Sequence, residues 1–476
     1  MIEGLKPYAE YKESGSKWLG AVPAKWEVRN LRTLISKRAE RDRPDLPLLS
    51  VAREKGVFVR SMTDADENHN VIPDDLTDYK VARAGNLVIN KMKAWQGSMG
   101  IAPCDGIVSP AYFVFDFRIA NHAFGQRLLR SKPYVAHFAQ ASDGVRVGQW
   151  DLSIPGMRQI PVLVPSDDEQ AAIVRFLDHA NRNIDGWVRA KRKLIGLLNE
   201  QKQAIIHRAV TRGLQPDVPL KPSGIPWLGD IPKHWEVIPL KGVCSVQSGI
   251  TLGKTYVDQN LNEFPYLRVA NVQAGHLSLK NVKTLRLPLS EAKRSTLQVG
   301  DVLMTEGGDP DKLGRGCVWN GEVPDCLHQN HVFAVRPSQK KMRPQYLAAL
   351  LESHYAKLYF LRTAKQTTNL ASTNKTTIGQ FRLLLPPVSE QDSILAGLAS
   401  ELEPVVTAIA RTEREIALMQ EYRTRLTADL VTGKLDVRAA AAKLPEEKSD
   451  VSEGSDQSDE SGLSVETDEP ILDEQS

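Results

Sequence analysis

The feature that most constrains the fold is a repeat near the start of each half of the chain. The stretch SGSKWLGAVPAKWEV begins at Ser14, and SGIPWLGDIPKHWEV begins at Ser223, 209 residues later. Residues 14–34 and 223–243 agree at ten positions, including two Trp at the same spacing in a chain with only eight Trp. This entrance motif predicts two copies of one unit. Four Trp flanked by Gly, Pro and Val are predicted to pack each entrance against a long helix: Trp18, Trp26, Trp227 and Trp235.

A second repeat closes each half. IPVLVPSDDEQAAIVRFL, from Ile160, matches FRLLLPPVSEQDSILAGL, from Phe381, at an offset of 221 residues. In both copies an apolar, strand-like run meets a proline, and an acid–Gln pair follows it. Acidic residues in a first turn interact favourably with the positive end of a helix dipole, so each pair predicts the start of a helix. The two pairs are Glu169-Gln170 and Glu390-Gln391.

The segments after these pairs carry apolar residues at alternating steps of three and four over five heptads. Such a narrow seam is the pattern of a coiled coil, and a helix of ~40 residues is ~60 Å long. If the two helices pack antiparallel, the halves are related by a pseudo-two-fold axis. Polar residues interrupt both seams at matching places and can fix the register. The predicted spacer and docking residues are Leu177, Ile184, Val188, Lys191, Ile195, Leu198 and Ile205, followed by Leu398, Val405, Ile409, Ile416, Met419 and Leu426.

Between each entrance and its helix, residues 35–160 and 244–380 are rich in Val, Leu, Gly, Asn, Pro and Asp, which predicts short strands joined by turns. The two stretches align only in patches. The predicted fold class is α+β: two α/β domains separated by two long helices that pack as an antiparallel coiled coil, with an internal pseudo-two-fold repeat. The predicted boundaries are 1–165 for the first domain, 166–214 for the first helix, 215–387 for the second domain, 388–437 for the second helix and 438–476 for a disordered acidic tail.

The net charge of +3 hides an asymmetry. From Pro445 onward the chain holds twelve acids and one base, so the preceding residues carry about +14. A body this basic suits a polyanionic partner, although solvated surface lysines are the simpler explanation of charge alone. No run of apolar residues has the ~18–20 uninterrupted positions of a membrane span. The four Cys form no disulfide pattern and the N-terminal residues do not resemble a signal peptide, so we expect a cytoplasmic protein with no membrane contact.

Several motifs resemble catalytic or ligand sites only superficially. SGITLGKT, residues 248–255, has Ser248 where a phosphate loop requires its first Gly, which favours a Gly-rich turn. Two Cys and two His between residues 317 and 331 lack metal-ligand spacing, so buried Cys and turn His are predicted. DPDK, residues 309–312, lacks the second acidic-x-Lys of a nuclease site. The sequence also lacks the glycine-rich cofactor loop and the Asn/Asp-Pro-Pro-aromatic motif of DNA methyltransferases.

Several loops combine Lys or Arg, which contact phosphates, with Gln, Asn, Thr and Arg, which pair with base edges. They are residues 90–98 and 142–150 in the first half, and residues 305–315, 329–331 and 365–369 in the second. For these loops as a set, DNA reading is favoured over a plain solvated surface. The candidate DNA-binding residues are Lys91, Lys93, Gln96, Ser98, Arg146, Gln149, Thr305, Lys312, Arg315, Gln329, Asn330, Thr368 and Asn369.

Together these features resemble the specificity (S) subunits of type I restriction–modification systems. The residues that carry the resemblance are the doubled S-G-x-x-W-L-G-x-x-P-x-x-W-E-V, GNLVINKMKAWQGSMG with IVSPAYFVF in the first half, and YLRVANVQAG with GDVLMTEGGDPDKLGRG in the second. The Pro…Glu-Gln openings of both helices complete the match. The resemblance covers residues 8–437 and leaves the acidic tail outside.

The resemblance implies that each variable region is a target recognition domain that reads one half of an asymmetric, bipartite site in double-stranded DNA. The paired helices would fix the spacer and dock two methyltransferase (M) subunits, and endonuclease (R) subunits would join them. The chain itself is then expected to be non-catalytic and to bind no cofactor or metal. S-adenosylmethionine, ATP and Mg²⁺ would act in the partner subunits, and the entrance tryptophans would pack rather than stack on bases.

Two other classes stay open on the residues alone. The chain could be a self-contained modifying or cleaving enzyme, which would methylate or cut DNA when purified alone. It could also be a protein-binding scaffold with duplicated domains. Salt-sensitive binding to one bipartite duplex, strengthened by M subunits, would distinguish DNA reading from the scaffold.

Overall fold

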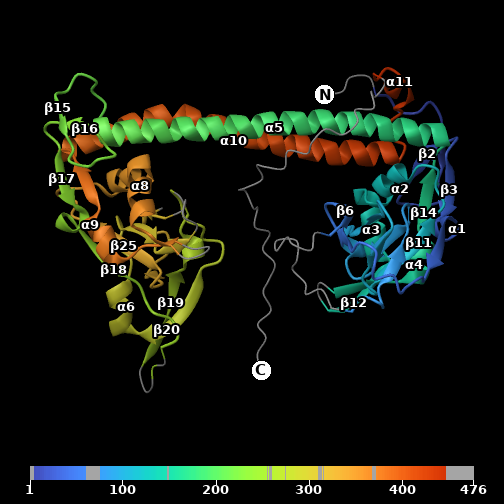
Figure 1. Cartoon of the computed structure of the whole chain (residues 1–476), viewed down its shortest axis with the longest axis horizontal. Helices are drawn as coiled ribbons and strands as arrows, with labels where there is room; N and C mark the ends of the chain where they lie inside the picture. Colours follow the sequence, from blue (N-terminus) through green and yellow to red (C-terminus); the bar gives the residue numbers. More distant parts are fainter. Residues whose placement is uncertain are drawn as a thin grey trace. The chain divides into compact units, whose positions relative to one another are not determined.

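The computed structural model describes residues 5–60, 75–146, 149–254, 256, 260–273, 275–308, 313–314, 316–366 and 371–445. The chain forms two compact units. Unit 1 comprises residues 1–183 and 422–476, and unit 2 comprises residues 184–421. Two long helices, α5 (Asp167–Arg212) and α10 (Val388–Val431), each contribute residues to both units (Figure 1).

Unit 1 is built on an antiparallel sheet with strand order β4-β11-β8-β9. β8 (Leu87–Asn90) lies inside this sheet and is buried along its whole length, as its run of apolar residues favours. α2 (His122–Leu129) and α3 (Lys132–Gln140) pack on the same core, and the Asn121 side chain caps α2. The other elements are β1 (Tyr11–Glu13), β2 (Ala21–Pro23), β3 (Glu27–Asn30), α1 (Leu31–Leu34), β4 (Ile35–Arg38), β5 (Leu49–Ala52), β6 (Gly56–Val59), β7 (Lys80–Ala82), η1 (Ala94–Gln96), β9 (Met99–Ile101), β10 (Gly106–Val108), β11 (Tyr112–Phe117), β12 (Ser142–Arg146), β13 (Gln149–Leu152), α4 (Ile154–Arg158), β14 (Pro161–Val164) and α11 (Arg438–Ala441).

Unit 2 repeats this plan in a sheet with strand order β18-β25-β21-β23. β21 (Val302–Thr305) is buried in the place of β8, and α7 (Pro344–Glu352) and α8 (His354–Thr363) pack on the core as α2 and α3 do. A further sheet, β20-β19-β24, has no described equivalent in unit 1. The other elements are β15 (Leu220–Pro222), β16 (Asp230–Pro232), β17 (Glu236–Pro239), η2 (Leu240–Gly242), β18 (Cys244–Ser248), β19 (Leu261–Leu267), η3 (Val269–Asn271), β20 (Lys283–Pro288), α6 (Leu289–Ser295), β22 (Gly307–Gly308), β23 (Gly316–Val318), β24 (Leu327–His328), β25 (Val332–Pro337), β26 (Lys365–Gln366), β27 (Ala371–Ser372), α9 (Lys375–Gln380) and β28 (Arg382–Leu385).

The two long helices pack antiparallel within unit 2. Lys191 Nζ lies 2.7 Å from Glu415 Oε2, and Arg208 Nη2 lies 2.6 Å from Glu401 Oε2. Residue numbers therefore rise along α5 as they fall along α10. The hydrogen bonds from Lys191 and Arg411 lower the pKa of the Glu415 carboxyl.

The seam predicted from the sequence is the packed face of both helices. Every predicted seam residue is buried or half-buried, whereas most residues between them are exposed. In unit 1, Leu177 and Leu426 belong to one core, so the two helices also meet there. The predicted antiparallel coiled coil is confirmed.

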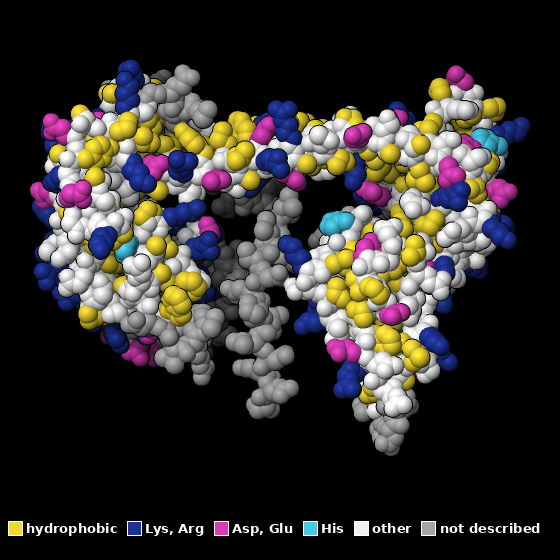
Figure 2. Space-filling model, turned by 180° about the vertical axis from the view of Figure 1, so that it is seen from behind, with side chains coloured by type: hydrophobic (Ala, Val, Ile, Leu, Met, Phe, Trp, Pro, Cys, Tyr) yellow, Lys and Arg dark blue, Asp and Glu magenta, His cyan; other side chains and the backbone are white. Residues whose placement is uncertain are grey.

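α10 is more apolar than its seam requires. An 18-residue window of the helix has a mean hydropathy of 1.4, which by length and composition alone would allow it to cross a membrane. Its seam packs against α5, but Val406 and Leu418 are exposed on α10, and Leu194 and Leu197 are exposed on α5. Figure 2 shows hydrophobic side chains along this helix pair.

The folded chain extends beyond residue 437, the predicted end of the second helix. Val437 and Ala441 are buried in the core of unit 1, and Arg175 donates a hydrogen bond to the carbonyl of Leu444 at 2.6 Å. Apolar residues spaced four and three apart give α11 a face to bury, so the predicted tail begins later than residue 438. Residues 446–476 lie outside the described residues.

Candidate nucleic-acid interface

The second tryptophan of each entrance motif anchors its unit to the end of a long helix. Trp26 and Trp235 are fully buried. Trp26 lies against Gly433 after α10, and Trp235 lies against Gly213 after α5. Both glycines have φ near +75°, a left-handed conformation that ends a helix and favours Gly. The predicted packing against the long helices is confirmed for these two residues.

The first tryptophan of each motif packs elsewhere. The Trp18 ring centroid lies 5.1 Å from that of Tyr134 and 3.5 Å from that of His137, both on α3. Trp227 is partly exposed, and the guanidinium of Arg362 on α8 lies 5.1 Å from its ring centroid. The predicted contact with a long helix is wrong for Trp18 and Trp227, because each lies over the shorter helix that follows the sheet.

The buried Gln of each acid–Gln pair explains why the pair occurs twice. Gln170 Oε1 accepts from the backbone N–H of Asn121 at 3.0 Å, and Gln391 Oε1 accepts from that of Arg343 at 2.8 Å. Each Nε2 donates at 2.9 Å to the carbonyl of the proline five residues earlier. Each Gln thus joins the start of a long helix to the start of the helix pair that covers the sheet.

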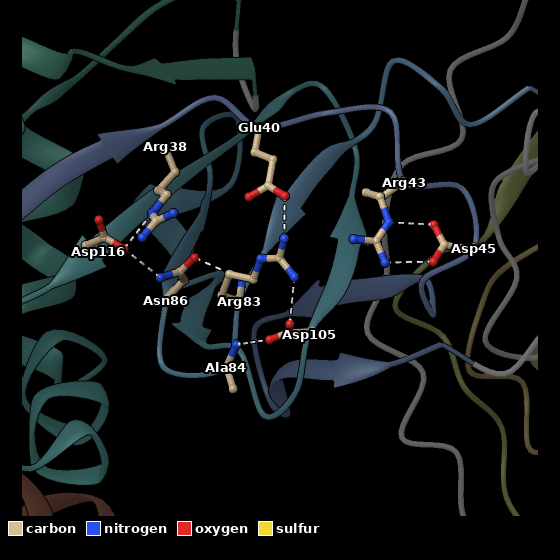
Figure 3. A network of polar contacts seen from close by, with 9 residues as sticks. All are labelled: Arg38, Glu40, Arg43, Asp45, Arg83, Ala84, Asn86, Asp105 and Asp116. Carbon is tan, nitrogen blue, oxygen red and sulfur yellow. Dashed lines mark hydrogen bonds and ion pairs between the residues drawn. The ribbon is translucent and has the colours of Figure 1, made fainter.

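A network of polar contacts fixes the approach to β8 in unit 1 (Figure 3). The Arg83 guanidinium binds Glu40, and its Nη1 donates to Asp105 at 2.8 Å. Arg38 Nε donates to Asp116 at 2.7 Å. The Arg83 contact holds the pKa of the Asp105 carboxyl below its usual range, and the Arg38 contact does the same for Asp116. These charges brace the strand whose far end carries the first candidate loop.

The turn before β21 in unit 2 is stabilised by different charged residues. Asn86 and Asp301 each follow a glycine with positive φ, 84° and 92°, and each side chain accepts from a backbone N–H three residues earlier. Asn86 Nδ2 donates to Asp116 at 3.1 Å. Asp301 instead receives two hydrogen bonds from Arg336, at 2.6 and 2.7 Å. Both units thus share the turn, but the acidic residue is Asp116 on the neighbouring strand in unit 1 and Asp301 in the turn itself in unit 2.

In unit 1 the structure brings the two predicted loops together. We call residues 91–98 and the paired strands β12 and β13 tip 1. Lys91 Nζ lies 3.1 Å from Asp151 Oδ2, and the Leu152 N–H donates to the Lys91 carbonyl at 2.9 Å. The rings of Trp95 and Trp150 lie 5.3 Å apart, centroid to centroid. One surface therefore combines residues that are far apart in sequence.

The candidate residues of tip 1 differ in exposure. Lys93 is exposed, and Lys91 and Gln96 are half-buried. Ser98 is only 2% exposed, so its side chain lies inside the unit. The side chains of Arg146 and Gln149 lie outside the described residues.

Unit 2 gathers its predicted loops in the corresponding place. Of these three loops the structure describes residues 305–308, 313–314, 329–331, 365–366 and 371–372, and we call these residues tip 2. The short strands β22 and β26 both pair with β27. The Glu306 N–H donates to the His331 carbonyl at 2.8 Å, and the His331 ring lies 2.5 Å from Glu306 Oε2. The described parts of the three predicted loops of this half thus meet after β21, as those of the two loops of unit 1 meet after β8.

Among the candidate residues of tip 2, Gln329 and Asn330 are half-buried. Their backbone N–H groups donate to the carbonyls of Leu267 and Ile250, each at 2.9 Å. Thr305 is buried at the end of β21. Lys312, Arg315, Thr368 and Asn369 lie outside the described residues.

The motifs that only superficially resemble catalytic or ligand sites have structural roles, where the structure describes them. Burial raises the pKa of the thiols of Cys317 and Cys326 to about 12, so the prediction of buried cysteines is confirmed. His328 is buried and shares a 2.6 Å hydrogen bond with the Val332 carbonyl. A Cβ at Gly249 would lie 2.0 Å from the His328 carbonyl oxygen, so close packing requires glycine there. Within the described ranges, no group of three or more His, Cys, Asp and Glu could hold a metal ion.

The chain is similar in sequence and in fold to specificity subunits of type I restriction systems. Residues 232–415 match the family model of the type I restriction modification DNA specificity domain. A putative type I restriction enzyme specificity subunit, MjaX of Methanocaldococcus jannaschii, is 24% identical over 43% of this chain and 47% of its own length. The EcoKI specificity subunit of Escherichia coli is 24% identical over 72% of this chain and 74% of its own. A chain from a solved type I R-M system shares the fold, with a TM-score of 0.59 at 16% identity, covering 86% of this chain and 98% of that one.

Proposed function

We propose that this chain, which belongs to the type I restriction–modification specificity subunits, reads a bipartite DNA site with one tip for each half-site. The observation that carries the proposal is the matched position of the tips. Each tip follows a buried inner strand of its sheet, and it joins that loop to a hairpin about 50 to 60 residues further along the chain. Two surfaces on equivalent scaffolds, with different side chains, suit the reading of two different half-sequences.

The charge of the chain supports DNA as the partner. Without the residues from 445 onward, the chain carries about +14. Lys and Arg neutralise phosphates and release counterions, so binding should weaken as salt rises. Phosphate contacts of this kind set position, whereas the polar groups of each tip distinguish base edges.

We assign the docking of methyltransferase subunits to the exposed surface of the helix pair in unit 2. Leu194 and Leu197 on α5 and Val406 and Leu418 on α10 are exposed there. A hollow of about 490 Å³ lies beside Pro404 on α10, lined also by Thr407 and Arg411. Leu197→Glu should weaken the complex with co-expressed methyltransferase subunits in native mass spectrometry, while an unchanged complex would contradict this assignment. Leu289→Glu, which changes a similarly exposed leucine on α6 and not on the helix pair, serves as the control.

The chemistry then belongs to the partner subunits. We propose that the chain positions them on DNA, and that methyl transfer from S-adenosylmethionine and ATP- and Mg²⁺-dependent cleavage occur in those subunits. The chain purified alone should neither methylate nor cut DNA. Methylation by the pure chain would overturn this division of labour.

Methylome sequencing of a host that carries the chain and its methyltransferase partner tests the proposal directly. We expect one bipartite methylated motif. Exchanging residues 244–380 for those of another recognition domain should change one half-site and leave the other intact. Alteration of both half-sites, or the absence of any bipartite motif, would reject the reading of one half-site by each tip.

The helix pair is proposed to set the spacer between half-sites. Inserting one heptad after Leu198 and another at an opposing position in α10 preserves the seam, because both helices keep their apolar period. The methylated motif should then have a longer spacer, or methylation should be lost. The same motif with an unchanged spacer would contradict this role.

A further inference from the structure

Tip 1 exposes large apolar side chains that are not buried in the core of unit 1. Trp150 is 36% exposed and Met92 is 40% exposed. The interplanar angle between the rings of Trp95 and Trp150 is 37°. Exposed apolar surface of this kind is typical of an interaction site. One face of the Trp150 indole is therefore supported by Trp95, and much of the remaining ring surface is available to a partner.

The supporting residue is held firmly. Trp95 Nε1 donates to the Met92 carbonyl at 3.1 Å, and Trp95 sits in the 3-10 turn η1, whose neighbouring residue Ala94 is fully buried. Gly97 closes this turn with φ near +89°, and the turn packs against α3. The aromatic pair is thus presented on a preorganised loop, which reduces the entropy that binding must overcome.

The polar surroundings favour a polyanionic partner with flat apolar rings. Lys93 is exposed beside Met92, and Lys91 is held near the pair by Asp151 and by the Leu152 N–H. Indole faces stack on nucleobases, and ammonium groups contact the phosphates on either side. Tip 1 offers both groups on one surface.

Tip 2 lacks this arrangement. Its three segments contain no Trp, Tyr, Phe or Met, and the positions that pair in its hairpin are Gly307 and Gly308 with Ser372 and Ala371. Its described side chains include Glu306 and His331, which share a hydrogen bond. The shared scaffold therefore does not require aromatic residues at this place.

We propose that Trp150, supported by Trp95, stacks on a base of the half-site read by unit 1 and locally unstacks the duplex there. This inference rests on the proposed function. Apolar side chains that enter a base step deform DNA and make binding depend on how easily that step unstacks. The half-site of unit 1 is then read partly through deformability, whereas that of unit 2 is read without an aromatic wedge.

The test uses the full chain with its methyltransferase partner and the duplex defined by the methylome. The half-site of unit 1 is the one that survives exchange of residues 244–380. 2-Aminopurine replaces one adenine of a half-site at a time, and never the adenine that is methylated, because methyltransferases flip their target base out of the stack. Its fluorescence rises when a base unstacks. We expect a rise in the half-site of unit 1 only.

Trp150→Ala should abolish this fluorescence rise and weaken binding roughly 10- to 100-fold, in line with the loss of one aromatic–base stack. Trp150→Phe keeps an aromatic face and should retain most of the signal, which separates stacking from misfolding. Trp227→Ala is the matched control, because Trp227 is also 36% exposed but lies in the entrance motif of unit 2.

Equal affinity and equal fluorescence for Trp150→Ala and the wild type would overturn the stacking proposal while leaving DNA reading intact. So would loss of the methyltransferase subunits from the Trp150→Ala complex, because the exposed ring would then contact protein. If the wild-type complex binds no bipartite duplex, the proposed function fails and the stacking proposal fails with it.

Discussion

Trp26 and Trp235 hold the same place in their two units, but their indole N–H groups differ. Trp235 Nε1 donates to Glu390 Oε1 at 3.0 Å. In unit 1 the equivalent carboxylate, Glu169, accepts from the Tyr8 hydroxyl at 2.6 Å, and no described residue accepts from Trp26 Nε1. The aromatic packing is common to both units, whereas the polar contact beside it is not. Packing volume is thus the shared constraint, and polar partners vary around it.

The same distinction separates the turns before β8 and β21. Both need a left-handed glycine and a short polar side chain that caps the turn. The charge differs, since Asn86 donates to Asp116 while Asp301 binds Arg336. Backbone geometry is repeated between the units, and electrostatic pairs are rebuilt locally. The tips extend this contrast to the surface, where only tip 1 carries tryptophans.

We expect the largest effect from Trp26→Ala and Trp235→Ala, which should each destabilise their own unit by a similar amount. Removing a fully buried Trp costs about 3–5 kcal/mol of unfolding free energy, because a cavity remains. Hydrogen exchange, measured separately for peptides of each unit, should show faster exchange in the unit that carries the substitution. A large effect in one unit and none in the other would break the equivalence of the two entrances.

Asp301→Asn should destabilise unit 2 by about 2–3 kcal/mol, because it leaves the partly exposed Arg336 without its buried acid. Chemical denaturation gives the change. The double variant Asp301→Asn/Arg336→Leu removes both charges and should recover part of the loss. If the double variant is less stable than the single one by a further 2 kcal/mol, the charge pair is not the source of the effect.

Trp→Phe substitutions sharpen the comparison of the entrances. Trp235→Phe deletes the hydrogen bond to Glu390, whereas Trp26→Phe deletes an N–H that has no described partner. We expect Trp235→Phe to cost about 1–2 kcal/mol more than Trp26→Phe. Equal costs would mean that the hydrogen bond of Trp235 adds nothing to stability.

The smallest effect is a difference in acid sensitivity. Burial lowers the pKa of His328, whereas no described histidine of unit 1 is fully buried. Below its ordinary pKa of about 6.5 the unfolded chain binds a proton that the folded chain excludes, so stability falls as pH falls. His328→Asn keeps a donor for the Val332 carbonyl without this proton. Its Tm should fall less than that of the wild type between pH 7 and pH 5, and parallel falls would exclude His328 as the cause.

The sequence predicts those features that depend on local spacing. The apolar seams of the two long helices, including Leu177 and Leu426, follow from steps of three and four. The acid–Gln pairs mark the start of both helices. Both signals are predictable because they depend on residues close together in the sequence. The same spacing could not show that Gln170 reaches Asn121, because that contact depends on the packing of α2. The sequence repeat therefore identifies the acid–Gln pairs, but the role of each Gln is seen only in the folded structure.

The sequence predicts which loops belong to the candidate interface, but it does not predict how those loops come together in one surface. Nothing local indicates that Trp95 and Trp150, 55 residues apart, share one tip, and neither is among the residues that the sequence predicts to bind DNA. Ser98 and Thr305 have suitable side chains but lie inside their units. The base contacts assigned to the other candidate residues stay predictions.

Unit 1 is assembled from two segments that are synthesised far apart in time. The core of unit 1 contains Leu426, Leu430, Val437 and Ala441, which leave the ribosome long after residue 183, whereas unit 2 is one continuous stretch. At ordinary elongation rates the first unit waits on the order of tens of seconds for its last core residues. The unit that begins the chain is therefore completed last, and during that interval its exposed apolar surface is a target for chaperones and proteases.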